Sequence, residues 1–159
     1  GVILSLIFRG FSKALKGLET ADSKALAKAL AEGTKAAYGA VMKPTEGTIL
    51  TVMRVMTETA EDAYTKGIIT DVSDLLPFMY KAADETLQKT PDMLPALKQA
   101  GVVDSGGAGL IYIVKGMTYW DFVLKKTSAS LRLPLIPYCL LSFSLVLNTQ
   151  PMRKDHTVK

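Results

Sequence analysis

Apolar residues recur every three or four positions through most of this chain, and that spacing constrains the fold more than any other feature of the sequence. Between Val2 and Leu18 the apolar residues share one face of a helix, and five later segments repeat the pattern. Before residue 125, no stretch alternates polar and apolar residues as a half-buried strand would. The sequence therefore predicts an all-α protein, a bundle or barrel of mostly antiparallel helices joined by short loops.

Residues that favour helix ends divide this pattern into separate helices. Asp22 or Ser23 is expected to cap a second helix that runs to about Met42. Thr45 is expected to cap a third helix, with Glu46 in the first turn. Gly67 is expected to end that third helix.

The same signals continue along the chain. Asp71 or Ser73 is expected to cap a fourth helix with Pro77 in its first turn, where a missing N–H group costs little. Thr90-Pro91 is expected to open a short fifth helix that ends at Gly101. A sixth helix is expected to begin within "SGGAGLIYIVKGM".

Charge and reactive side chains exclude several classes of function. Residues 1–125 carry 14 basic and 14 acidic residues, so the net charge of +4 arises in residues 126–159. No stripe of Lys and Arg with interleaved aromatics appears, so no nucleic-acid partner is expected. One Cys and one His exclude an intramolecular disulfide and argue against a His/Cys metal site or a Ser-His-Asp triad. A cytoplasmic location is expected.

The end of the chain differs from the rest in composition. Residues 133–147 carry no charge, but Pro134 and Pro137 interrupt them, and a membrane span needs about 20 apolar residues. A buried or poorly ordered extension is the favoured interpretation, and membrane association through this segment is the less favoured alternative. The chain opens at Gly1 directly into a helical pattern, without a signal peptide, so we expect it to start inside a larger protein.

Two glycine-bearing stretches lie at expected helix starts, "KPTEGTIL" and "DSGGAGL". The N-terminus of a helix presents unpaired N–H groups and suits phosphate, and glycine lets a ligand approach the backbone. On these residues alone, an ordinary loop-to-helix junction is the better explanation. Neither stretch is a Walker loop or a dinucleotide-binding motif, and no loop carries the closely spaced carboxylates that magnesium requires.

The ordered series "GVILSLIFRGF", "KPTEGTILTVMR" and "TPDMLPALKQAGVVDSGGAGL" resembles the Dak2 (DhaL-like) nucleotide-binding domain family. Within that family it looks most like the catalytic subunit of bacterial fatty acid kinase. The resemblance implies part of a barrel of eight antiparallel helices with a nucleotide at one end. It divides the chain into a partial DhaL-like domain, residues 1–119, and an atypical tail, residues 120–159.

The resemblance also implies which positions contact ATP or ADP. Gly1 matches the last residue of a Gly-Asn-Ser-Gly turn that contacts phosphates. The Thr48-Ile49 pair matches a Thr-Met/Ile-Leu step, and residues 104–106 match a late Asp-Pro/Ser/Ala-Gly loop. The implied nucleotide-contacting residues are Gly1, Gly39, Thr48, Ile49, Asp104, Ser105 and Gly106.

The sequence departs from the family pattern in its metal site. The family holds Mg²⁺ with an Asp-Gly-Asp-Thr-Gly-type loop, and this sequence contains no such loop. Phosphoryl transfer depends on positioning and on charge neutralisation by metal. We therefore assign no catalytic residue and no metal ligand, and we expect the chain to be a fragment that is inactive alone.

The resemblance leaves more than one function open. The preferred hypothesis is a kinase domain that transfers phosphate from ATP to a fatty acid held by a DegV-like partner subunit. The alternatives are the ATP-binding subunit of a glycerone (dihydroxyacetone) kinase and a non-catalytic helical module that binds a partner through an apolar face. The opening segment "GVILSLIFRGF" weakly favours the fatty acid branch.

Overall fold

The computed structural model describes the backbone of residues 1–127 and the side chains of residues 1–119. The described backbone is helical, without strands, which confirms the all-α prediction. The helices are α1 (Val2–Ala14), α2 (Ser23–Gly39), α3 (Ile49–Thr65), α4 (Val72–Met93), α5 (Pro95–Ala100) and α6 (Ser105–Thr127).

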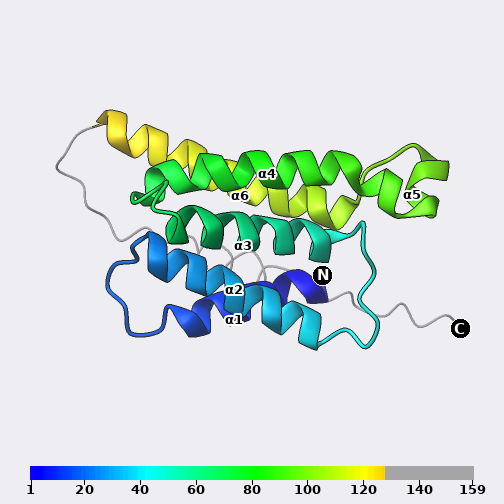
Figure 1. Cartoon of the computed structure of the whole chain (residues 1–159), viewed down its shortest axis with the longest axis horizontal. Coiled ribbons are helices and arrows are strands. Elements are labelled where there is room, and N and C mark those ends of the chain that lie inside the picture. The colour runs from blue at the N-terminus through cyan, green and yellow to red at the C-terminus, as the bar shows by residue number, and fades with distance from the viewer. Residues whose placement is uncertain (128–159) are drawn as a thin grey trace, which may run out of the picture. The chain divides into compact units, whose positions relative to one another are not determined.

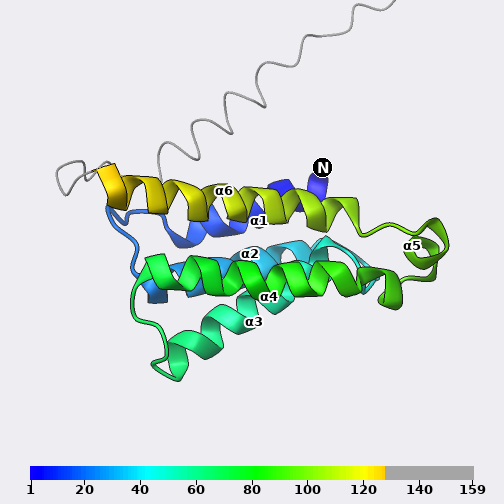
Figure 2. The same cartoon turned by 90° about the horizontal axis from the view of Figure 1, so that it is seen from above.

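The long helices form an antiparallel bundle in which α3 packs against α2, α4 and α6 (Figures 1 and 2). Helices α1, α3 and α6 run in one direction, and α2 and α4 run in the other (Figure 1). The core is formed by residues from all five, with the largest fully buried side chains on α3 and α4. Met53, Met56, Leu75 and Met79 are each no more than 2% exposed.

Two glycines let α1 and α2 approach closely. A Cβ atom added to Gly10 would lie 2.6 Å from the carbonyl oxygen of Glu32 and 2.8 Å from the Cα of Gly33. A Cβ added to Gly33 would lie 2.9 Å from the carbonyl oxygen of Ile7. Only glycine at these positions allows the two backbones to come this near, because any side chain would collide with main-chain atoms.

Several expected helix ends are confirmed. Asp22 caps α2 by accepting a hydrogen bond from the Ala25 amide at 2.7 Å. Asp71 caps α4 in the same way. Gly67 follows α3 with a φ of 63°, and Gly101 follows α5 with a φ of 66°, the left-handed conformation that glycine adopts without strain.

Three expected ends are wrong. Helix α1 ends at Ala14, before Leu18, because the chain turns at Gly17 with a φ of 83°. Helix α2 ends at Gly39, and Met42 is fully exposed beyond it. Thr48, not Thr45, caps α3, because Gly47 takes a φ of 81° that a helix cannot include.

The prolines of α4 also lie deeper in the helix than the sequence suggested. The helix begins at Val72, so Pro77 falls in its second turn rather than its first. Thr90-Pro91 does not open a new helix, because α4 continues through both residues to Met93. The fifth helix opens instead at Pro95, after Leu94. A local hydrogen bond from Thr90, described below, explains why Pro91 is tolerated.

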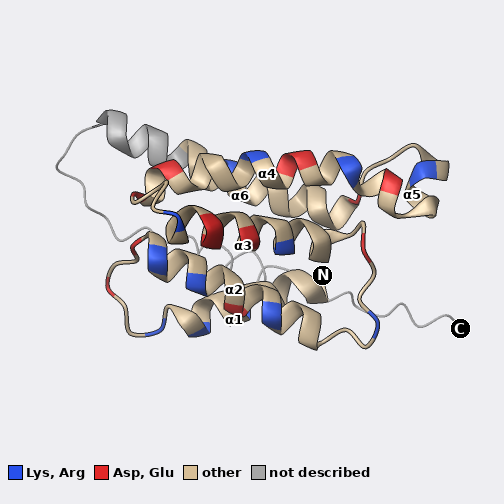
Figure 3. Cartoon of the chain, viewed as in Figure 1, with Lys and Arg blue, Asp and Glu red and all other residues tan. Residues whose placement is uncertain are grey.

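Basic and acidic residues are interspersed along α2, α3 and α4, whereas α1 carries basic residues only (Figure 3). Helix α6 extends past Tyr119 to Thr127, into the segment that the sequence analysis separates as an atypical tail. The uncharged segment 133–147 lies outside the described residues. Within the part of the chain that the structure describes, no helix combines the length and apolar character needed to cross a bilayer.

Candidate functional site

The starts of α1, α3 and α6 lie at one end of the bundle, where α2 and α4 finish (Figures 1 and 2). Every residue that the resemblance implicates belongs to one of these helix ends. Gly1 precedes α1, Gly39 ends α2, Thr48 and Ile49 open α3, and residues 104–106 open α6. Residues far apart in the sequence are therefore collected at one end of the fold, where helix N-termini present partial positive charge.

The turn that opens α3 is held by its own side chains. The Thr48 hydroxyl accepts a hydrogen bond from the Leu50 amide at 3.3 Å and donates one to the Thr45 carbonyl at 2.8 Å. A Cβ atom added to Gly47 would lie 3.0 Å from the Cβ atoms of Met93 and Leu94. Gly47 is therefore required for two reasons, its positive φ and its contact with the end of α4.

The start of α6 is capped by Asp104. Its carboxylate accepts a hydrogen bond from the Gly107 amide at 2.6 Å, and its carbonyl accepts one from the Ala108 amide at 2.9 Å. These bonds satisfy N–H groups that a helix start otherwise leaves unpaired. The side chain of Asp104 thus has a structural role as the cap of α6.

The glycines of this loop bring α6 against α3. A Cβ on Gly106 would lie 3.3 Å from the Cβ of Ile49, and a Cβ on Gly107 would lie 3.0 Å from side-chain carbons of Val52 and Leu87. The two glycine-bearing stretches are therefore direct neighbours. Gly106 and Gly107 are therefore needed at least partly because a side chain would collide with α3 and α4, and not only because a ligand needs space.

Thr90 links these two loops and was missed by sequence reasoning. It is fully buried, and its hydroxyl donates to the Leu87 carbonyl at 2.7 Å. In a regular helix that carbonyl would accept from the residue four positions later, but Pro91 has no N–H group. The same hydroxyl accepts from the Asp104 amide at 3.1 Å. A Thr directly before a Pro near a helix end was the signal that could have identified it.

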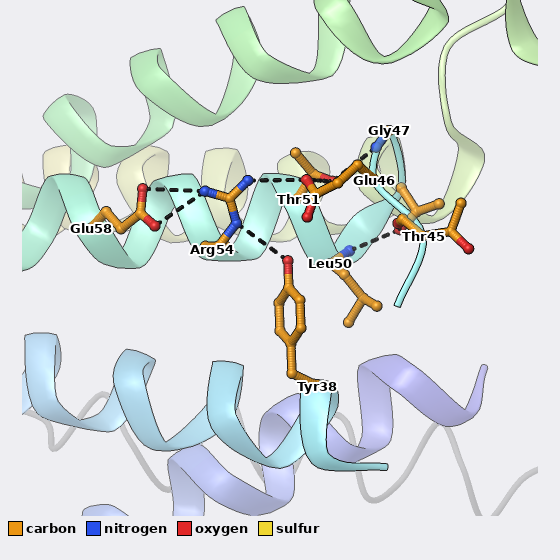
Figure 4. A network of polar contacts seen from close by, with 9 residues as sticks. Tyr38, Thr45, Glu46, Gly47, Leu50, Thr51, Arg54 and Glu58 are labelled. Atoms are coloured by element: carbon orange, nitrogen blue, oxygen red, sulfur yellow. Dashed lines mark hydrogen bonds and ion pairs between the residues drawn. The ribbon is translucent and has the colours of Figure 1, made fainter. Parts of the chain in front are cut away.

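A polar network joins the last turn of α2 to the turn before α3 (Figure 4). Arg54 on α3 donates to the Tyr38 hydroxyl at 3.3 Å, to Glu46 at 3.0 Å and to Glu58 at 3.1 Å. Thr51 donates its hydroxyl proton to the Glu46 carboxylate at 2.8 Å. Glu46 therefore lies outside α3, facing back toward it, and not in the first turn as the sequence suggested.

The network shifts the titration of its two central charges. The hydrogen bond from Thr51 is the main reason that the pKa of Glu46 lies below its ordinary value, and Arg54 contributes to the same effect. The hydrogen bonds of Arg54 to Tyr38, Glu46 and Glu58 raise the pKa of its guanidinium further above the normal range. Both groups are consequently held in their charged forms at neutral pH.

A shallow pocket of about 300 Å³ lies beside this network, between α2 and α3. Its lining residues combine two cations, one carboxylate and three hydroxyl groups. They are Ala31, Thr34, Lys35, Tyr38, Arg54, Thr57 and Glu58. The Thr34 and Thr57 hydroxyls lie 2.6 Å apart and bond to each other, so they close the floor between the two helices.

Gly1 and Gly39 share this end of the bundle, but beyond their chain neighbours and local helix backbone no described atom lies close to the position of a Cβ on either residue. A Cβ built on either glycine would meet no atom within 4 Å. Their backbones are therefore open to approach. The packing of the α6 loop against Ile49 does not include Gly1 or Gly39.

The donors at this end do not fit a magnesium site. Among the described residues, no group of three or more His, Cys, Asp or Glu side chains could hold a metal ion. Glu46 is occupied by Thr51 and Arg54, and Asp104 is occupied by the Gly107 amide. Mg²⁺ is usually held through one or two carboxylates and water, and both of these carboxylates already accept hydrogen bonds from protein groups.

Comparison with known proteins agrees with this arrangement. The family model described as "DAK2 domain" matches residues 1–119. An uncharacterized protein of Staphylococcus saprophyticus is 47% identical over 117 residues, covering 73% of this chain and 21% of that protein. Protein YloV of Bacillus subtilis is 46% identical over 121 residues, with the same coverage of both chains.

An uncharacterized protein of Staphylococcus aureus strain USA300 is 45% identical over 117 residues, again covering 73% of this chain and 21% of the relative. The chain thus spans about a fifth of the length of the curated relatives it matches. The family model covers the helices that build the site, including the starts of α1, α3 and α6. The chain belongs to the Dak2 domain family.

Proposed function

We propose that this chain supplies the nucleotide-binding end of a kinase domain that transfers phosphate from ATP to a fatty acid. The observation that supports the nucleotide site is that the starts of α1, α3 and α6 lie at one end of the bundle, with the α6 loop directly against the start of α3. Dak2 domains generally bind ATP or ADP and work with partner subunits. The proposed partner is a DegV-like subunit that holds the fatty acid, and the use of ATP as donor leads us to propose a cytoplasmic location.

The residues proposed to contact the nucleotide are those at this end of the bundle. They are Gly1, Gly39, Thr48, Ile49, Asp104, Ser105 and Gly106. The exposed backbone at Gly1 and Ser105 lies at the starts of α1 and α6, where N–H groups and the helix dipole favour phosphate oxygens, whereas Gly39, at the C-terminal end of α2, would only leave room for the ligand. ATP would supply the phosphoryl group that is transferred.

The proposal gives the described residues a binding and positioning role, without a metal-dependent step. Their carboxylates do not form a magnesium site, and no side chain is assigned to proton transfer. We therefore propose that the 159-residue chain binds nucleotide but does not turn it over by itself. An assay of this chain with ATP, Mg²⁺ and fatty acid that showed turnover would contradict this part of the proposal.

The nucleotide site can be tested with a charge at the start of α6. Ser105 is exposed at the first position of the helix, where an acidic residue is compatible with the helix dipole. Ser105→Glu should preserve folding but repel phosphate, weakening ADP binding on the order of tenfold in calorimetric titration. Ser105→Gln, which has the same size without the charge, is the matched control and should bind ADP like the unaltered chain.

The same titration separates this proposal from a non-catalytic helical module. If the chain is a module of that kind, the unaltered chain, Ser105→Glu and Ser105→Gln should all fail to bind ADP. Equal ADP affinity in the Glu and Gln variants would place the nucleotide away from the α6 start. The acceptor is tested separately with the product of the intact gene, by adding either a fatty acid with a DegV-like protein or dihydroxyacetone with its own partner subunit.

A further inference from the structure

We infer that Arg54 is a positioning residue that holds the Glu46–Thr48 turn in the shape needed at the nucleotide site. Arg54 lies in the second turn of α3, and it reaches the turn through Glu46 rather than touching Thr48 itself. The inference rests on the proposed function for its link to nucleotide. Its structural part, the ordering of the turn, can be tested without any ligand.

The hydrogen bonds form a continuous path from Arg54 to the backbone of the turn. Arg54 Nη2 donates to Glu46 Oε2 at 3.0 Å, and the same oxygen accepts from Thr51 Oγ1 at 2.8 Å. Thr51 Oγ1 in turn accepts from the Gly47 amide at 2.9 Å, in a buried position. The carboxylate therefore orients the Thr51 hydroxyl so that its lone pair faces Gly47.

Arg54 also ties the turn to a second helix end. Its Nε donates to the Tyr38 hydroxyl, and Tyr38 lies one residue before Gly39, the last residue of α2 (Figure 4). Its Nη1 donates to Glu58 one turn further along α3, which fixes the guanidinium from the other side. A planar guanidinium can serve these three directions at once, whereas the single ammonium group of Lys cannot.

The far side of the turn is fixed by packing. A Cβ at Gly47 would meet Met93, Leu94 and the carbonyl oxygen of Thr90 at 3.0 to 3.1 Å, and Thr90 bonds to the Asp104 amide. The turn is thus held between the Arg54 network on one side and the end of α4 on the other. Loss of the network leaves the packing contact intact, so the turn should loosen without unfolding the bundle.

The test measures amide hydrogen exchange by NMR in the full chain. Arg54→Gln should raise the exchange rate of the Gly47 amide by about tenfold, the factor expected for losing one hydrogen bond. Tyr38→Phe removes a single arm of the network and should give a smaller increase. Arg54→Lys keeps the charge but not the planar geometry, so it should restore only part of the protection.

Lys66→Gln is the matched control. It removes a Lys66–Asp62 ion pair of the same i, i+4 type from the opposite end of α3, and it should leave the Gly47 exchange rate unchanged. Unchanged exchange at Gly47 in the Arg54→Gln protein would overturn the inference. If Arg54→Gln does not fold, an unchanged Gly47 exchange rate in Tyr38→Phe would overturn the inference instead.

ADP titration of the same variants tests the link to nucleotide. ADP affinity should fall in the order unaltered chain, Tyr38→Phe, Arg54→Gln, while Lys66→Gln binds like the unaltered chain. Faster exchange with undiminished ADP affinity would overturn the positioning role. If the unaltered chain binds no ADP, the proposed function fails, and the exchange rates alone then decide whether Arg54 orders the turn.

Discussion

At the scale of single residues, this end of the bundle depends on side chains that satisfy backbone groups. Thr90 replaces the N–H group that Pro91 lacks and also receives the Asp104 amide. Thr48 and Asp104 pair the first N–H groups of α3 and α6. Each of these residues stabilises a loop that contributes to the proposed site, so substitutions here should alter both stability and local order.

Replacing Thr90 by Val should destabilise the protein by about 1–3 kcal/mol, because Val fills the same space but leaves the Leu87 carbonyl and the Asp104 amide without their partner. Thr90→Ser retains the hydroxyl and should lose much less. Urea unfolding followed by circular dichroism measures both. Equal stability of the Val and Ser variants would show that the hydroxyl contributes nothing.

Glu46 should make folding sensitive to acid. Because its pKa is lower in the folded protein than its ordinary value of 4.5, the ionised carboxylate stabilises the fold above that pH. This contribution is lost as pH falls through the folded pKa. Its side chain is 52% exposed, so solvent screening should keep the effect below about 1 kcal/mol.

The measurement compares unfolding free energies between pH 7 and pH 3. Glu46→Gln should be less stable than the unaltered chain at pH 7, and the difference should become smaller towards the acidic end. Glu61→Gln removes an exposed charge from α3 and is the control. A stability difference for Glu46→Gln that did not change with pH would contradict the assignment.

At the scale of helices, close backbone contact distinguishes the α1–α2 pair. The positions of Gly10 and Gly33 leave no room for a side chain between the two backbones. Large apolar residues on α3 and α4 fill the core instead, with Met53, Met56 and Met79 fully enclosed. The bundle therefore combines one pair of helices in backbone contact with others separated by side chains.

Gly10→Ala should destabilise the protein by about 1–3 kcal/mol, because the added methyl group would overlap main-chain atoms of α2 that cannot move independently. Gly116→Ala is the matched control on α6, since a Cβ there meets no atom within 4 Å. That control should raise stability by up to about 1 kcal/mol, the difference in helix propensity. Thermal unfolding that ranked the two variants in the reverse order would refute the close crossing.

At the scale of the whole described bundle, the helices differ in how many neighbours they pack against. Helix α3 packs against α2, α4 and α6, while the substantial packing of α1 is with α2. A helix held by one neighbour can separate while the rest stays folded. The site combines both kinds of element, because it includes the start of α1 and the start of α3.

Native-state hydrogen exchange should therefore show α1 amides opening at a lower free energy than those of α3 and α4. Met56→Ala should lower the opening free energy of α3 and α4 by about 2–5 kcal/mol, since the residue is 1% exposed in the core. Exchange from α1 should respond less, provided that α1 opens separately. Equal opening free energies in all helices would indicate one cooperative unit.

How much of the candidate site was predictable depends on the range of the interactions. Asp104 precedes its helix as a capping residue does, whereas Thr45 was wrongly preferred as the cap of α3 and Thr48 was implicated only by the resemblance. The resemblance supplied the roles proposed for Gly1 and Gly39. The Glu46–Arg54–Tyr38 network was missed, since nothing in the local sequence pairs residues on two helices and a loop.

The amino-acid sequence by itself determined the all-α fold and about half of the helix ends, because apolar periodicity, capping side chains and left-handed glycines act over a few neighbouring residues. Only the tertiary structure decided that Gly106 meets Ile49, that Thr90 bonds to Asp104, and that Arg54 connects α2 to the turn before α3. These contacts join residues distant in the chain, and they exist only after the helices have packed and their backbones have taken their relative positions.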